Sequence, residues 1–111
     1  MTKRVLKNLD YLKALHCSSK REKGNLLRSA KSEIINAICD CIKNILLGNI
    51  EVTSKEKRKL QPKKKILRKL ADRKTKTLER KKILVQQGTG ILTAILAPAL
   101  GALASGLLSK I

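Results

Sequence analysis

The chain has 111 residues, a length that allows one small domain with a modest core. Its 26 lysines and arginines outnumber its 8 aspartates and glutamates, which gives a formal net charge of +18. An excess of this size calls for a polyanionic counterpart, so nucleic acid and an anionic membrane surface are the two candidate partners. A large preformed catalytic cleft is not expected in so short a chain, and we expect a binding protein and not an enzyme.

Charge divides the sequence into three segments. Residues 1–52 carry ten basic and five acidic side chains, residues 53–82 carry fifteen and three, and residues 83–111 carry only Lys110. Such blocks are typical of interaction proteins. We expect an all-α protein with a small N-terminal helical bundle over 1–52, a polybasic helical region over 53–82 and an apolar, Gly/Ala-rich C-terminal helix within 83–111.

Apolar residues at helical spacing predict the helices of the first segment. One face of a first helix is formed by Val5, Leu9, Leu12 and His16. Ser19 and Glu22 have the spacing of a capping box and predict a second helix, which Gly24 and Asn25 are expected to end early. The stretch SAKSEIINAICDCIKNILLG predicts the strongest helix, with Gly48 as its left-handed stop.

The polybasic segment is predicted to begin with a capping box formed by Thr53 and Glu56. Pro62 is expected to kink this helix, or to restart it with Gln61 as the cap. Because like charges this dense repel one another, we expect the helix to be partly frayed until phosphates neutralise it. Its expected apolar seam is thin and consists of Ile66, Leu67, Leu70, Leu78 and Ile83.

The excess of positive charge between residues 53 and 82 predicts contact with the phosphates of double-stranded DNA. Lysine outnumbers arginine there, which favours point-charge contact with phosphate over bidentate reading of bases. Tyr11 is the only aromatic residue in the sequence, so base stacking is not expected. The predicted nucleic-acid contacts are Lys55, Lys57, Arg58, Lys59, Lys63, Lys64, Lys65, Arg68, Lys69, Arg73, Lys74, Lys76, Arg80, Lys81 and Lys82.

Two further DNA-related interpretations of the sequence stay open. The segments from Lys20 to Leu47 have the minimal outline of a helix-turn-helix, a short helix followed by a longer one, which would make the chain a DNA-binding regulator. The stretch KRKLQPKKK is compatible with a nuclear import signal.

No catalytic or cofactor motif is evident, and we expect no cofactor. His16 and Cys17 together with Cys39 and Cys41 suggest zinc, but two positions on a helix separate Cys39 from Cys41 by roughly 200°. We therefore expect no metal site and interpret the three cysteines as small buried or half-buried apolar groups. In the absence of an export signal they are expected to stay reduced.

The apolar tail has three possible fates. Residues 90–108 are uncharged and would measure about 28 Å as a helix, which matches the hydrocarbon thickness of a membrane. Ala97, Gly101 and Ser105 recur at the four-residue spacing that lets membrane helices approach closely. The chain would then be a tail-anchored or membrane-active protein whose polybasic segment contacts anionic lipid. Alternatively, the tail packs on the protein itself or is removed.

The order of these segments resembles a family of viral proteins. A basic block from Lys55 to Lys82, then Gly88 and Gly90, then ILTAILAPALGALASG, is similar to the precursor of adenovirus core protein X, or mu, and to late proteins of adintoviruses and Polinton-type elements. The resemblance implies a virion protein that condenses packaged double-stranded DNA, located in the virion core and the host nucleus. This chain differs in being lysine-rich and in having a longer helical N-terminus.

The resemblance also implies processing by a viral cysteine protease, and contact with capsid proteins. The family's protease site spans five positions. The first is an aliphatic residue or Asn or Gln, the third and the fifth are Gly, and the second and the fourth can be any residue. Gln86, Gly88 and Gly90 match it, which predicts a cut between Thr89 and Gly90 at the junction of the basic and apolar segments. An uncleaved tail would place the protein at an intracellular membrane instead.

Overall fold

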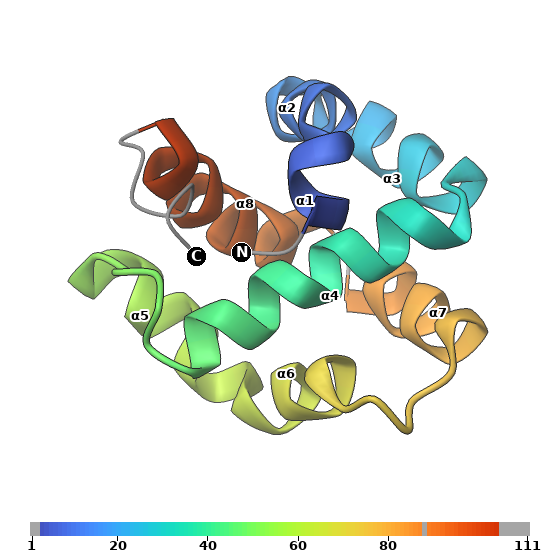
Figure 1. Cartoon of the computed structure of the whole chain (residues 1–111). Helices are drawn as coiled ribbons and strands as arrows, with labels where there is room; N and C mark the ends of the chain where they lie inside the picture. The colour runs from blue at the N-terminus through green and yellow to red at the C-terminus, as the bar shows by residue number, and fades with distance from the viewer. Residues whose placement is uncertain (1–2, 88, 105–111) are drawn as a thin grey trace.

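A computed structural model describes residues 3–87 and 89–104 of the chain (Figure 1). Every regular element within these ranges is a helix, so the all-α prediction is confirmed. In chain order the elements are α1 (Lys3–Lys7), α2 (Leu9–Cys17), α3 (Lys20–Ser29), α4 (Ser32–Leu46), α5 (Ser54–Leu60), the 3-10 helix η1 (Gln61–Lys63), α6 (Lys64–Ala71), α7 (Thr77–Gln87) and α8 (Thr89–Ala104).

Helix α4 lies at the centre, and the other helices pack around it (Figure 1). Its contacts are most extensive with α6, α7, α8 and α1, while α2 and α3 lie on the opposite side of α4 from α5 and α6. Its apolar positions recur along most of the circumference, which is the pattern of a helix surrounded by protein. Eight of its side chains are buried: Ile34, Ile35, Ala37, Ile38, Cys39, Cys41, Ile42 and Asn44.

The end of α4 is formed as the sequence predicts. Gly48 has a φ of +81°, a left-handed conformation that costs glycine little. The Gly48 N–H donates to Ile45 O at 3.1 Å and the Asn49 N–H donates to Asn44 O at 2.9 Å. These two bonds make a Schellman motif, which satisfies carbonyls that the helix end would otherwise leave unpaired.

Helix α3 is longer than the sequence predicts, because Gly24 and Asn25 do not interrupt it. The Ser19 side chain caps its start by accepting a hydrogen bond from the Glu22 N–H. Glycine inside a helix costs only about 1 kcal/mol, and the packing of Leu27, which is 1% exposed, offsets that cost. The prediction of an early end was wrong because tertiary packing outweighed local propensity.

The polybasic region, residues 53–82, forms α5, η1, α6 and the first part of α7, with a turn at residues 72–76. The complete capping box of Thr53 and Glu56 starts α5, and Pro62 falls in η1, which joins α5 to α6. The buried side chains of Leu60, Leu67 and Leu70 attach α5 and α6 to the core. A narrow apolar seam is sufficient to attach these helices to the core, because each of the three leucines is at most 6% exposed. Burying one leucine contributes roughly 1.5–3 kcal/mol to the free energy of unfolding.

The predicted seam does not continue beyond α6. The chain turns at residues 72–76, so α7 starts in a new direction, and Leu78 is 79% exposed. The Asp72 side chain accepts a hydrogen bond from the Lys74 N–H at 3.0 Å within this turn. An Asp carboxylate that accepts a hydrogen bond from the backbone N–H two residues further along the chain favours a turn. The helical spacing of the leucines had instead predicted one continuous helix here.

Helix α8 is a core helix. It contacts α4, α2, α5 and α7, and its buried side chains include Leu92, Ile95 and Leu96, each 0% exposed. The Lys23 side chain, itself buried, reaches from α3 and donates to Thr93 Oγ1 at 2.9 Å. The single hydrophobic cluster therefore draws on all three charge segments, and within the described residues the apolar tail is packed on the protein.

Candidate nucleic-acid interface

The fifteen predicted DNA contacts are spread over α5, η1, α6, the turn at residues 72–76 and α7. Nine lie on α5, η1 and α6, three in the turn at residues 72–76, and three on α7. Thirteen of the side chains are exposed, whereas Arg80 and Lys81 are half-buried. Helix α6 packs on α4 and α5 packs on α8, and Leu60, Leu67 and Leu70 lie in the hydrophobic core, whereas the charged residues of α5 and α6 named above are exposed.

Three of the fifteen cations bind other parts of the protein. Lys69 Nζ pairs with Glu79 Oε1 at 2.8 Å. Arg80 donates from NH1 to Asn36 Oδ1 at 2.9 Å and from NH2 to Asp72 O at 2.8 Å, and Lys81 donates to Ala30 O. These contacts hold α7 to α4, to the end of α3, to α6 and to the preceding turn, so Arg80 and Lys81 contribute to the fold.

The other twelve cationic side chains have no hydrogen bond or ion pair with the described residues. Eight of them belong to α5, η1 and α6, the elements at the left and bottom of Figure 1, and we call these eight exposed side chains the basic surface. Like charges gathered on three consecutive short helices raise the free energy of the protein until an external anion offsets them. The basic surface consists of Lys55, Lys57, Arg58, Lys59, Lys63, Lys64, Lys65 and Arg68.

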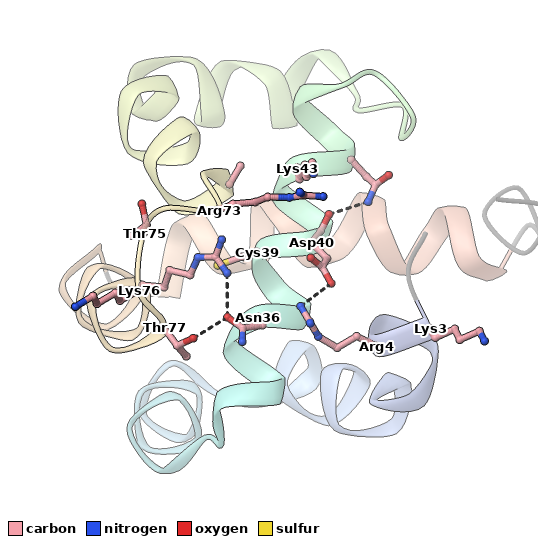
Figure 2. Close-up of a pocket in the computed structure, with 13 residues that line it drawn as sticks. Lys3, Arg4, Asn36, Cys39, Asp40, Lys43, Arg73, Thr75, Lys76 and Thr77 are labelled. Carbon is pink, nitrogen blue, oxygen red and sulfur yellow. Dashed lines mark hydrogen bonds and ion pairs between the residues drawn. The ribbon is translucent and has the colours of Figure 1, made fainter.

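A second basic region is a cleft of about 760 Å³ over α4, bounded by α1, α7 and the turn at residues 72–76 (Figure 2). We call it the basic cleft. Asp40 is the one acidic side chain among the described lining residues, and it forms an ion pair with Arg4 at 3.3 Å. Asn36 Oδ1 accepts from both Thr77 and Arg80. The cationic lining residues are Lys3, Arg4, Lys43, Arg73, Lys76 and Arg80.

Sequence reasoning missed the basic cleft. Arg73, Lys76 and Arg80 belong to the polybasic segment, but Lys3, Arg4 and Lys43 come from the first segment, whose charges are mixed. Only the packing of α1 and α7 on α4 brings the two sets together. A four-residue spacing of Asn36 and Asp40 on α4 was the one local signal, because it places two polar side chains on the same helix face.

Within the described residues no Phe, Trp or Tyr ring lies exposed on the surface. Tyr11 is half-buried and its hydroxyl donates to Leu26 O at 3.2 Å, so its ring is part of the packing between α2 and α3. Helix α4, the second helix of the possible helix-turn-helix, is surrounded by other helices. A recognition helix has to enter the major groove, and the helix-turn-helix interpretation stays a prediction.

The three cysteines are thiols in different surroundings. Cys17 is exposed at the end of α2, and Cys39 and Cys41 are buried in α4. His16 is half-buried, and its Nδ1 has no hydrogen-bond partner among the described residues. Within residues 3–87 and 89–104 no three His, Cys, Asp or Glu side chains gather in a group that could hold a metal ion.

Thiol reactivity should separate the cysteines. Burial raises the pKa of the Cys39 and Cys41 thiols from 9.0 to about 12, with Asp40 adding to the increase. Because the thiolate is the nucleophile, a disulfide reagent at neutral pH should modify one thiol per native chain quickly, at Cys17, and the other two only after unfolding. Equal rates for all three thiols in the native protein would contradict this burial.

The same pKa shifts give a direction for the pH dependence of stability. The folded-state value lies above the unfolded value of 9.0 for both buried thiols. The folded state therefore binds these protons more tightly, and this contribution is fully present below pH 9.0 and lost as the pH rises towards 12.

The predicted protease site lies at the corner between α7 and α8. Gln86 and Gln87 end α7, Thr89 and Gly90 begin α8, and Gly88 lies outside the described residues. The bond between Thr89 and Gly90 is thus at the start of a helix whose following residues are buried. Cleavage there stays a prediction.

Two of the small residues predicted to pack against another helix, Ala97 and Gly101, line a shallow groove between α8 and the start of α5. Ala97 is half-buried, and Gly101 is exposed, with room around it for a methyl group. Ser105 lies outside the described residues. Among the described residues no single helix is long and apolar enough to cross a membrane; α7 and α8 together pass on length and composition only, with a bend of 110° between them.

Comparison of the chain with protein-family models, curated proteins and solved structures finds no match.

Proposed function

We propose that this protein binds double-stranded DNA without sequence preference and condenses it, through phosphate neutralisation by the basic surface. The observation that carries the proposal is a set of eight exposed lysines and arginines on α5, η1 and α6 whose charges have no partner in the described protein. A protein that neutralises phosphates releases the counterions condensed on DNA, which provides most of the affinity in non-specific binding.

The size of the protein is compatible with six to ten phosphate contacts. Its longest dimension is 31 Å. A stretch of duplex of that length carries about 18 phosphates, because B-DNA has one charge per ~1.7 Å of its axis. About half of those phosphates face any one side of the duplex. The eight side chains of the basic surface therefore match the number of phosphates within reach.

Condensation requires one protein to contact more than one duplex. The opposite side of α4 also carries exposed cations, at Lys13 on α2, Lys20 and Arg21 on α3, and Lys31 before α4. None of these side chains has a hydrogen bond or ion pair with the described residues. A globule with cations on opposite sides can bridge two duplexes, whereas a single basic face can only coat one.

The role of a virion core protein precursor forms part of the proposal. It rests on the resemblance of the basic block and the following apolar segment to the precursors of core protein X, and on the match of Gln86, Gly88 and Gly90 to their protease site. Because α8 packs in the core, removal of the tail by such processing also requires α8 to leave the core, either before or after the cut.

Binding of a fluorescent duplex of arbitrary sequence, followed by anisotropy at low salt, tests the proposed function. We expect binding, with unlabelled duplexes of unrelated sequence competing equally, because phosphates carry no sequence information. Two results would refute it: no binding at low salt, or a strong preference for one sequence over random competitor. The second result would favour a DNA-binding regulator.

A further inference from the structure

We infer that the basic cleft over α4 is a binding site for one small, multiply phosphorylated anion, distinct from the basic surface of α5, η1 and α6. The inference does not depend on DNA binding. It follows from the charges that line the cleft, from the hydrogen bonds that hold two of its arginines, and from the lack of partners for the others.

Two arginines are held in place before any ligand arrives. Arg4 is paired with Asp40 at 3.3 Å, and Arg80 is bonded to Asn36 Oδ1 and to Asp72 O. The Nε atom of Arg80 is buried and has no hydrogen-bond partner among the described residues. Guanidinium groups fixed in this way lose little side-chain freedom on binding, and their remaining N–H groups match the oxygens of phosphate.

The other two inner cations have no anion to pair with. Figure 2 shows Arg73 extending from the turn over α4 in the direction of Lys43, while Lys3 and Lys76 point outwards. Neither Arg73 nor Lys43 has a side-chain hydrogen bond or ion pair with the described residues. Six cations with one carboxylate, itself paired with Arg4, leave a strong positive potential in a concave site, where the low-dielectric walls focus it.

The volume and chemistry of the cleft define the class of ligand. About 760 Å³ lies within the range of small-molecule sites, roughly 300–1,000 Å³. Among the described residues of the lining none is aromatic, and Cys39 and Ala71 are the only apolar ones. The cleft can therefore bind several phosphate groups but offers no surface on which a nucleobase could stack. Affinity should follow the number of phosphates and not the presence of a base.

Calorimetric titration of the full-length protein with tripolyphosphate, at about 0.15 M salt to screen exposed charges, tests the site. We expect saturation at one ligand per chain, and ATP should bind no more tightly than tripolyphosphate. Arg73→Ala should weaken binding about tenfold or more, because a hydrogen bond to a charged group is lost. Arg73→Lys should recover only part of that loss, since the bidentate geometry is missing.

Lys74→Ala is the matched control. Lys74 is the next residue in the same turn, it is exposed, and it does not line the cleft, so the variant removes the same charge from nearly the same place. It should change the tripolyphosphate affinity by about twofold at most, as expected for a screened surface charge. Lys43→Gln, on the opposite wall, should weaken binding like Arg73→Ala.

Several results would overturn the inference. They are titration without saturation, equal effects of Arg73→Ala and Lys74→Ala, and ATP binding far more tightly than tripolyphosphate. Adding duplex DNA to the complex of the protein with tripolyphosphate distinguishes the two phosphate sources. If the duplex displaces tripolyphosphate one for one, the cleft is part of the DNA interface and not a separate site. DNA binding that fails while tripolyphosphate still binds would refute only the proposed function.

Discussion

A chain that ends at Thr89 is expected to lose its cooperative thermal unfolding transition. Such a chain lacks Ile91, Leu92, Ile95 and Leu96, which are at most 7% exposed in the core. Each contributes roughly 1.5–3 kcal/mol by burial, and their sum of more than about 6 kcal/mol is comparable with the whole free energy of unfolding of a small domain, about 5–15 kcal/mol. Circular dichroism during heating measures the transition.

Single substitutions in α8 test the same prediction by smaller changes in the free energy of unfolding. Leu96→Ala removes most of a fully buried side chain and should cost about 2–5 kcal/mol. Gly101→Ala is the control in the same helix, because the added methyl group meets nothing within 4 Å; it should leave the melting temperature unchanged or raise it, since alanine is the better helix former. A cooperative transition at an unchanged temperature in the chain that ends at Thr89 would show that α8 is dispensable.

The dependence of the fold on α8 bears on proteolytic processing. A protease needs access to the backbone around the cut, and the bond after Thr89 begins a helix that is buried within two residues. Cleavage of the folded protein should therefore depend on local opening of α8. We expect the cleaved body to be held together by bound DNA more than by its own core, because a ligand that binds a folded state stabilises it.

The affinity for duplex DNA is expected to fall by about 10³ to 10⁵ between about 50 mM and about 200 mM salt. The reason is counterion release by six to ten phosphate contacts, a range that includes the eight cations of the basic surface. Anisotropy with a labelled duplex at several salt concentrations measures the fall. Affinity that stays constant over this range would mean that hydrogen bonds to bases or apolar contacts, and not phosphate neutralisation, carry the binding.

Local signals were sufficient for several helix boundaries. The Thr53 and Glu56 capping box and the Gly48 stop depend on contacts within a few residues, and both occur as predicted. The apolar face of α4 also followed from spacing alone, because its period is that of a helix. These features need no knowledge of the rest of the chain.

Other features depend on tertiary packing. Hydropathy could show that residues 90–108 are apolar but not which surface would cover them, and only the core formed by α2, α4, α5 and α7 places α8 inside the protein. The continuation of α3 through Gly24 likewise depends on packing of Leu27. The basic cleft joins Arg4 to Arg73 across most of the sequence, so the local spacing of Asn36 and Asp40 was not sufficient to predict it.

The central claim, that the basic surface binds duplex phosphates, is tested most directly by the slope of log affinity against log salt concentration in matched variants. Gln in place of Lys63, Lys64 and Lys65 should make this slope shallower by about 0.9 for each lost contact. Gln in place of Lys13, Lys20 and Arg21, exposed residues on the other side of α4, should leave the slope for binding to one short duplex close to the wild-type slope and weaken only the bridging of two duplexes. Equal slopes for the two variants would contradict the claim.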